Sequence, residues 1–217
     1  ADAVVCGTIG RFDRHLKLIM DVLGKREGVK TAAAMNMLIT SKGTVFIADT
    51  NVTLDPDAEQ IADITLLAAD ALRKMGVEPK VALLSHTNFG AREDSASQKM
   101  AKALRRIRKR APELEVDGEM KADSALLENL RERVFPGSRL TGSANLLIMP
   151  NLDAANISTT LVKVLAAEGI AVGPIMLGTR WPAHILTRSS TMRRIINMTA
   201  VAVVDAQLSG MPADRGD

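Results

Sequence analysis

The segment 187–190, Thr-Arg-Ser-Ser, gathers three hydroxyl groups and a guanidinium directly before an apolar-periodic stretch. This pattern predicts a helix that starts near Thr191 and has exposed backbone N–H groups in its first turn. Hydroxyls, free amides and a cation at one helix start are suited to bind an anion such as a phosphate. Thr187, Arg188 and Ser190 are therefore the first candidate ligand-binding residues.

Two other polar loops follow apolar runs that have the length of buried strands. The loop after 81–84 contains Ser85, Thr87, Asn88 and Gly90, and the loop after 146–149 contains Asn151, Asp153 and Asn156. Loops at the carboxyl ends of parallel strands line the crevice where ligands bind, so both loops are site candidates. Capping of the following helix explains each Asn or Asp of the second loop equally well.

Two basic segments carry weaker signals. The turn 7–10 could admit a phosphate with help from Arg11 and Arg14, but its two glycines lack the dinucleotide-binding spacing. The basic run 105–110 complements a helix dipole at a predicted helix end. That run is therefore interpreted as a solvated helix face in preference to a polyanion site.

The composition argues against several classes of function. An aromatic content of 2% leaves few platforms on which nucleic-acid bases could stack. Cys6 is the only cysteine, and no segment reaches the roughly 18 apolar residues of a membrane span, so we expect a cytoplasmic protein without disulfides. Asp117, Glu119 and Asp123 have no His or Cys beside them, so we expect no metal site there. Asp123 is equally suited to cap a helix.

Apolar runs and helical periodicity alternate along the chain. Strands are predicted at 3–6, 32–40, 44–49, 81–84, 114–116, 146–149 and 170–176, and amphipathic helices follow most of them. This alternation predicts an α/β fold with a mainly parallel sheet flanked by helices. A short turn joins the strands at 32–40 and 44–49, which implies an antiparallel edge. The segment 177–184 is predicted as a loop, and 212–217 as a loose tail.

Three of the helices have predicted ends or faces. Asp55 and Pro56 are expected to be the N-cap and the first residue of a long helix. The apolar faces are expected at Ile157, Leu161 and Leu165 on the helix after Asn151, and at Ile195, Thr199 and Val203 on the last helix. The former helix is expected to end at Glu168, with Gly169 closing it.

Several segments, in the right order, resemble motifs of the phosphate acetyl/butyryltransferase family. They are Ala1–Gly7, Phe46–Asp49, Asp55–Gln60, Val81–Ser85, Val116–Glu119, Ala144–Pro150 with Asn156, and Val172–Pro174. The closer resemblance is to the carboxy-terminal phosphotransacetylase-like domain of bacterial hybrid NADP-dependent malic enzymes. It is carried by Gly118–Met120, Asp153–Ser158 and Arg193–Ala200.

The resemblance implies two α/β lobes, in an architecture like that of isocitrate and isopropylmalate dehydrogenases, with a cleft that receives coenzyme A. Residues 1–23 and 178–217 would form the first lobe, incomplete because its amino-terminal part is absent, and 24–177 the second. The chain has no initiator Met, so we expect it to come from a longer polypeptide. In that polypeptide an upstream malic-enzyme domain would bind NADP and a divalent metal. This fragment would need no cofactor.

The resemblance also implies roles for two arginines. Arg188 occupies the place of the family arginine that holds the acyl phosphate or thioester, and Lys17 is expected as its charge partner. Six residues later, the family has an aspartate that deprotonates the coenzyme A thiol, and here Arg194 stands in its place. A guanidinium with a pKa above about 12 cannot accept that proton. A nearby cation could still favour the thiolate electrostatically.

Three functions follow from this resemblance. The first is a catalytically inactive, regulatory domain of an NADP-dependent malic enzyme, with acetyl-CoA or CoA as its ligand and acetyl-CoA as effector. The alternative is an active phosphate acetyltransferase, which moves acetyl between CoA and phosphate. The third is a dimerisation scaffold with an empty cleft. A homo-oligomer is expected, with neither nucleic acid nor membrane as a partner.

Overall fold

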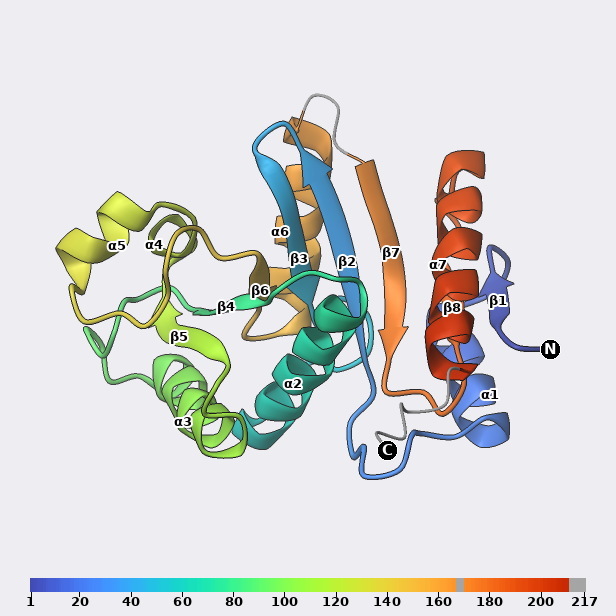
Figure 1. The fold of residues 1–217 in the computed structure, drawn as a ribbon, viewed down its shortest axis with the longest axis horizontal. Helices are drawn as coiled ribbons and strands as arrows, with labels where there is room; N and C mark the ends of the chain where they lie inside the picture. Colours follow the sequence, from blue (N-terminus) through green and yellow to red (C-terminus); the bar gives the residue numbers. More distant parts are fainter. Residues whose placement is uncertain (167–169, 211–217) are drawn as a thin grey trace, which may run out of the picture.

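The computed structural model describes residues 1–166 and 170–210, which form a mixed α/β fold with two sheets (Figure 1). The strands are β1 (Val4–Gly7), β2 (Ala33–Thr40), β3 (Gly43–Ala48), β4 (Lys80–Leu84), β5 (Glu115–Met120), β6 (Leu146–Ile148), β7 (Ile170–Leu177) and β8 (Ala183–Leu186). The helices are α1 (Phe12–Val22), α2 (Ala58–Lys74), α3 (Ser95–Arg110), α4 (Ala122–Leu126), α5 (Glu128–Val134), α6 (Leu152–Leu165) and α7 (Met192–Gly210).

The larger sheet has six strands in the order β5-β4-β6-β3-β2-β7. β5, β4, β6 and β3 pair in parallel, whereas β2 is antiparallel to both of its neighbours. The predicted α/β class with a mainly parallel sheet is confirmed, and so is the β2–β3 hairpin. The prediction of an antiparallel edge is wrong, because β7 pairs along β2 from Ala33↔Leu177 to Ile39↔Ile170 and places β2 inside the sheet.

Helices cover both faces of this sheet. Phe46 and Ile47 are neighbours on β3 and belong to different core clusters, since successive strand residues point to opposite faces. The cluster around Phe46 includes residues of α2 and α3, which lie together on one side (Figure 1). The cluster around Ile47 includes Ala125 of α4 and Ala155 of α6. The loops that leave the carboxyl ends of the parallel strands are therefore held by a core on each face.

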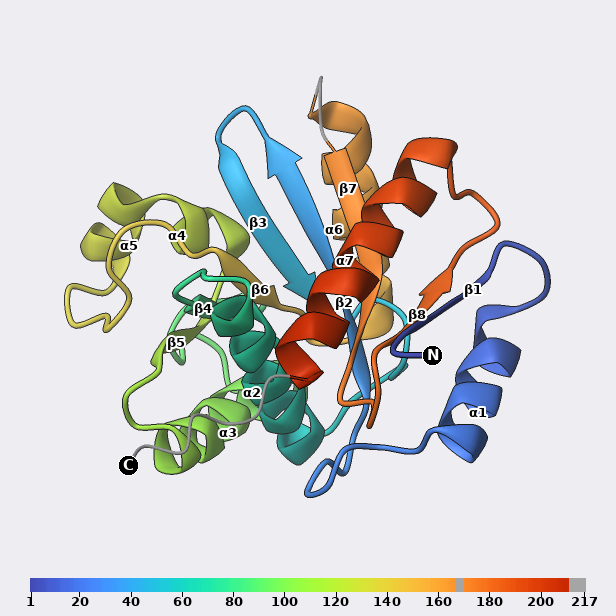
Figure 2. The ribbon, with the colours of Figure 1, turned by 45° about the vertical axis from the view of Figure 1, so that its right-hand side comes forward.

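The smaller sheet consists of β1 and β8, paired in parallel from Val4↔Ala183 to Gly7↔Leu186. α1 packs on it through Ile19, and α7 runs close by (Figure 2). The predicted loop 177–184 is therefore wrong at both ends, since Leu177 is the last residue of β7. The last two residues of this segment pair with β1, although the strand they begin has only four residues.

The start of α2 differs from the prediction. Asp57, not Asp55, is the N-cap, because its Oδ1 accepts hydrogen bonds from the N–H groups of Glu59 and Gln60 at 2.8 and 2.9 Å. The Gln60 side chain accepts the N–H of Asp57 at 2.9 Å, which completes a capping box. Asp55 instead forms an ion pair with Lys99 at 2.6 Å.

The structure of the acidic segment 117–123 also differs from the prediction. β5 extends to Met120, so Asp117 and Glu119 are buried within a strand and not in a loop. Asp117 accepts hydrogen bonds from the Arg108 side chain and the Arg139 N–H at 2.8 and 2.7 Å. The alternative that Asp123 caps the helix is wrong, because α4 begins at Ala122. Two short helices, α4 and α5, follow β5.

The apolar faces expected on the last two large helices are largely exposed. Ile157, Leu161 and Leu165 of α6 are 59%, 54% and 77% exposed, and Ile195, Thr199 and Val203 of α7 are exposed as well. α7 buries Met198 and Ala202 instead, and it packs against β7 and β8. Glu168, Gly169 and the expected tail 212–217 lie outside the described residues. Within the described part, no helix has both the length and the apolar content to cross a membrane.

Candidate functional site

Three loops meet around an open hollow of about 500 Å³, which we call the Arg188 hollow. The loops are those between β1 and α1, between β3 and α2, and between β8 and α7. The lining residues are Ile9, Gly10, Arg11, Phe12, Asp13, His15, Asn51, Leu186, Thr187 and Arg188. Two of the predicted ligand residues, Thr187 and Arg188, are thus in one hollow.

The turn before α7 is held by its own hydroxyl groups. The Thr187 N–H donates to Ser190 Oγ at 3.2 Å, and the Ser190 N–H donates to the Thr187 carbonyl at 3.0 Å. The Thr187 hydroxyl lies 3.2 Å from Ser189 Oγ. This turn presents Arg188, whose Nε donates to the Gly10 carbonyl at 3.2 Å. The guanidinium is exposed and keeps further N–H groups for an anion.

The turn after β1 forms the opposite wall. A Cβ on Gly7 would lie 2.2 Å from the Leu186 carbonyl oxygen, so only glycine allows β1 and β8 to approach this closely. His15 Nε2 lies 2.7 Å from the Ile9 carbonyl oxygen and fixes the turn to α1. Arg11 forms an ion pair with Asp13 at 2.8 Å. Arg188 is therefore the cation of this hollow that no carboxylate contacts within the described residues.

Sequence reasoning missed the third wall, which Asn51 provides. The preceding Asp49 is buried, and its carboxylate accepts the N–H groups of Asn51 and Thr53 at 3.0 and 2.7 Å. Burial raises the pKa of Asp49, while these hydrogen bonds act in the opposite direction. Asp49 is a carboxylate directly after a buried strand, and it is the last residue of the motif 46–49. That position could have identified the loop as a site candidate from the sequence.

The loop after β4 lines a different hollow of about 400 Å³. Thr87, Asn88 and Gly90 lie there beside Phe135. The Gly90 N–H donates to Glu119 Oε1 at 2.6 Å, and Asn88 Oδ1 accepts the Lys121 N–H at 2.8 Å. Ser85 is half-buried, with its Oγ 3.5 Å from His86 Nδ1. These bonds fasten the loop to β5 and the start of α4.

The loop after β6 supplies structural contacts. Asn151 is the N-cap of α6, because its Oδ1 accepts the Ala154 N–H at 2.9 Å. Asn156 Nδ2 donates to the Thr50 carbonyl at 3.0 Å, and Asp153 is exposed in the first turn of α6. The capping interpretation is thus confirmed for Asn151. None of the three predicted residues lines the Arg188 hollow or the hollow beside Phe135.

Lys17 and Arg194 also lie outside these two linings. Lys17 is exposed on α1. Arg194 is half-buried in the first turn of α7, where its N–H donates to Thr191 Oγ1 at 3.3 Å. Burial lowers the pKa of its guanidinium. A thiol that approached the start of α7 would therefore find a cation, and not a carboxylate, at position 194.

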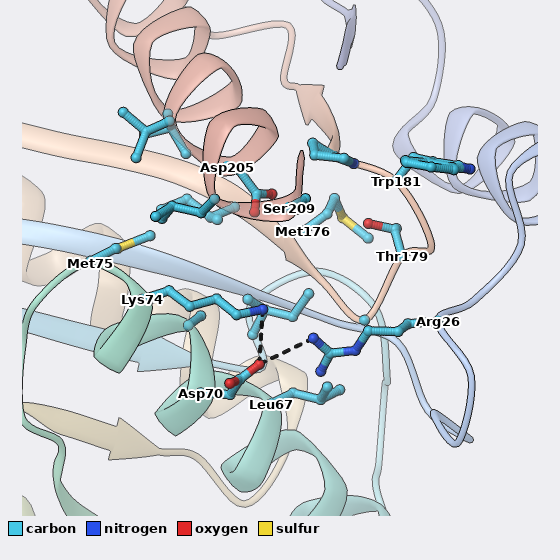
Figure 3. A pocket seen from close by; sticks show the side chains of 18 of the residues that line it. Arg26, Leu67, Asp70, Lys74, Met75, Met176, Thr179, Trp181, Asp205 and Ser209 are labelled. Carbon is cyan, nitrogen blue, oxygen red and sulfur yellow. Dashed lines mark hydrogen bonds and ion pairs between the residues drawn. The ribbon is translucent and has the colours of Figure 1, made fainter. Parts of the chain in front are cut away.

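Another hollow, of about 290 Å³, contains none of the predicted residues. It lies between α2, the β7–β8 loop and α7, with Trp181 at its rim (Figure 3). Arg26 and Lys74 each lie 3.2 Å from Asp70, and Asp205 faces them across the hollow (Figure 3). Its walls are otherwise mainly apolar.

Comparisons with known proteins show the family of the chain. The family model for phosphate acetyl/butaryl transferase matches residues 1–203. The chain is 52% identical over 207 residues to an NADP-dependent malic enzyme of Escherichia coli, covering 95% of this chain and 27% of that enzyme. It is 34% identical to a phosphate acetyltransferase of Paracoccus denitrificans, covering 95% of this chain and 67% of that enzyme.

Solved structures give the same result. A phosphotransacetylase from Staphylococcus aureus has a TM-score of 0.87 at 26% identity, over 95% of this chain and 63% of that one. A phosphotransacetylase from Streptococcus pyogenes has a TM-score of 0.89 at 24% identity, over the same shares, and shows the fold alone. The chain spans about a quarter of the length of the malic enzymes that it matches. It belongs to the phosphate acetyl/butaryl transferase family.

Proposed function

We propose that the chain is a regulatory, acetyl-CoA-binding domain of an NADP-dependent malic enzyme and is itself catalytically inactive. One observation carries the proposal: Arg188 lines an open hollow at the start of α7, while Arg194 stands where the family resemblance implies the general base. The first feature suits an anionic ligand. The second removes the group that would deprotonate a thiol. Binding without turnover is what an effector site requires.

In this proposal the anionic part of acetyl-CoA or CoA lies against Arg188 and the turn that contains Thr187. The elements β1, α1, β8 and α7 would form one lobe, and the six-stranded sheet with its helices the other. The loop between β3 and α2 reaches the Arg188 hollow from the second of these lobes. A ligand held by Arg188 would therefore contact both.

The longer protein is part of the proposal. The malic enzymes that resemble this chain extend well beyond it, which supports an upstream domain that oxidises and decarboxylates malate with NADP and a divalent metal. Neither of these groups is assigned to residues of this chain. A cytoplasmic location and a homo-oligomer complete the proposal.

Phosphate acetyltransferase is the second candidate function. The likeness to the Paracoccus denitrificans phosphate acetyltransferase supports it. The two functions differ in turnover: an enzyme makes acetyl phosphate and CoA from acetyl-CoA and phosphate, and a regulatory domain does not. Turnover at about 1 per second or faster would favour the transferase.

Calorimetric titration with acetyl-CoA tests the binding. The variant Arg188→Ala should weaken binding by about 1.5 to 3 kcal/mol, because a hydrogen bond to a charged group is lost. Arg193→Ala is the matched control, since Arg193 is an exposed arginine in the first turn of α7, five residues after Arg188, and does not line the hollow. A folded wild-type protein that binds no acetyl-CoA at millimolar concentration would refute the proposal, and equal weakening in both variants would move the site elsewhere.

A further inference from the structure

The loop 49–53 between β3 and α2 holds one side of the Arg188 hollow. We propose that the Asn51 side chain contacts the bound ligand directly and that Asp49 is the positioning residue that holds Asn51 in place. The inference rests on the proposed acetyl-CoA site and adds two residues to it.

The first support is the bonding of Asp49, whose side chain is buried at 4% exposure. Oδ1 accepts the N–H groups of Ala34, Asn51 and Val52 at 3.0, 3.0 and 3.2 Å. Oδ2 accepts the N–H of Thr53 at 2.7 Å. One carboxylate thus connects the loop to β2 and accepts hydrogen bonds from three successive N–H groups of the loop. Removing it would leave buried donors unpaired.

A second set of contacts holds Thr50, the residue between Asp49 and Asn51. The Asn36 Nδ2 donates to Thr50 Oγ1 at 2.8 Å, and the Thr50 N–H donates to the Ala34 carbonyl at 2.9 Å. The Asn156 Nδ2 of α6 donates to the Thr50 carbonyl at 3.0 Å. The backbone on the amino side of Asn51 is therefore fixed from both β2 and α6.

Asn51 itself is bonded differently. Its backbone is fixed by Asp49, but its half-buried side-chain amide makes no hydrogen bond within the described residues. The amide offers two donors and one acceptor oxygen. It lines the same hollow as Arg188. A fixed backbone that carries a free amide is the arrangement expected of a ligand contact.

The chemistry of the amide indicates which part of the ligand it would bind. Arg188 suits the phosphates because a guanidinium pairs with anionic oxygens. A carboxamide instead suits a neutral group that both donates and accepts, and coenzyme A carries peptide-type amides and, when acylated, a thioester carbonyl. Asn51 would therefore bind the neutral arm of the molecule while Arg188 holds its charge.

Titration with acetyl-CoA tests the contact. Asn51→Ala should weaken binding about 2- to 10-fold, the loss of one neutral hydrogen bond. Asn129→Ala, which removes an exposed amide on α5, is the matched control and should leave the affinity unchanged. Asn51→Ala with wild-type affinity would overturn this inference alone. Absence of binding by the wild-type protein would overturn the proposed function as well.

A double-mutant cycle tests the positioning role. If Asp49 acts through Asn51, Asp49→Asn should weaken binding in the wild-type background and have little further effect in the Asn51→Ala background. A merely structural role would weaken binding equally in both, and that result would overturn the assignment of Asp49. If Asp49→Asn does not fold, Asn156→Ala serves in the same cycle, because it removes the tether to Thr50 together with a hydrogen bond to the Leu152 carbonyl of its own helix and leaves Asp49 in place.

Discussion

His184 lies on β8 and is fully buried. Its Nδ1 accepts the Met176 N–H at 3.2 Å, which places the ring proton on Nε2. Nε2 has no hydrogen-bond partner within the described residues and lies 3.8 Å from Asp205 Oδ2. Burial lowers the pKa of His184 to about 4 and raises the pKa of Asp205. The imidazole is therefore neutral at pH 7.

This geometry predicts a loss of stability in acid. Between pH 6.5 and about 4 the unfolded chain protonates His184 while the folded protein does not, so the free energy of unfolding should fall by up to about 3 kcal/mol. His184→Gln removes the titrating imidazole and should flatten this decline in urea unfolding measured across that range. His86→Gln removes a half-exposed imidazole, and the comparison isolates the effect of burial.

Asp205 acts in the opposite direction as the pH falls. Its raised pKa means that the folded protein binds its proton more tightly, so this group stabilises the fold as the pH falls through that pKa. Lys74 and Arg26 favour its ionised form and Asp70 opposes it. A His184→Gln profile that declines as steeply as the wild type would contradict the assignment to His184.

The roles of residues whose contact partners are close in the sequence could be predicted. The roles of residues with partners far away in the sequence could not. The cluster at Thr187 and Arg188 is local, so its types and spacing predicted an anion-binding turn. Asn51 gave no such signal, because its position depends on a carboxylate that bonds β2 and on a tether from α6. Asn156, by contrast, was predicted as a ligand residue, and the structure shows it bonded to Thr50.

At the scale of the element, α2 offers a test between two possible caps. Asp57→Ala should destabilise the protein by about 0.5 to 2 kcal/mol, because it leaves two N–H groups at the helix start unpaired. Asp55→Ala should cost less than about 1 kcal/mol, since the Asp55 carboxylate is exposed and an ion pair with an exposed partner contributes little. Guanidinium unfolding of both variants measures the difference. A larger loss for Asp55→Ala would reverse the assignment of the cap.

Long elements could be predicted from periodicity, and short ones could not. α3 spans Ser95–Arg110 and ends with the basic run 105–110, where a helix end was predicted, because sixteen residues give several turns of periodic signal. β8 has four residues and exists because β1 is available to pair with it. Such pairing is a long-range property that no local pattern reports.

α6 leads to a prediction about assembly. Its exposed Ile157, Leu161 and Leu165 form an apolar face that the described residues leave uncovered, and such faces mark contacts with other proteins. If the face joins two copies, Leu161→Glu should shift the protein to a smaller species in sedimentation experiments at several concentrations. Lys163→Glu adds a carboxylate to the same helix and is the control. A wild-type monomer at every concentration would contradict the expected homo-oligomer.

At the scale of the whole molecule, the proposal requires coupling between acetyl-CoA and malate. The chain spans about a quarter of the malic enzymes that it resembles, so the coupled sites would lie in different domains of the longer protein. An effector shifts an equilibrium only if it binds one global state more tightly than the other. Movement of β1, α1, β8 and α7 against the six-stranded sheet is the two-state element that we propose, because the Arg188 hollow contains loops of both.

The expected sign is inhibition, because acetyl-CoA is formed downstream of the pyruvate that a malic enzyme makes. A coupling of about 1 to 3 kcal/mol would lower malate affinity or turnover several-fold to about a hundredfold. Steady-state malate oxidation by the full-length protein, with and without acetyl-CoA, measures that ratio. Arg188→Ala should bring the ratio to one, and Arg193→Ala should preserve it. If both variants remain as sensitive as the wild type, the effector binds elsewhere, and an insensitive wild type would remove the regulatory role from this domain.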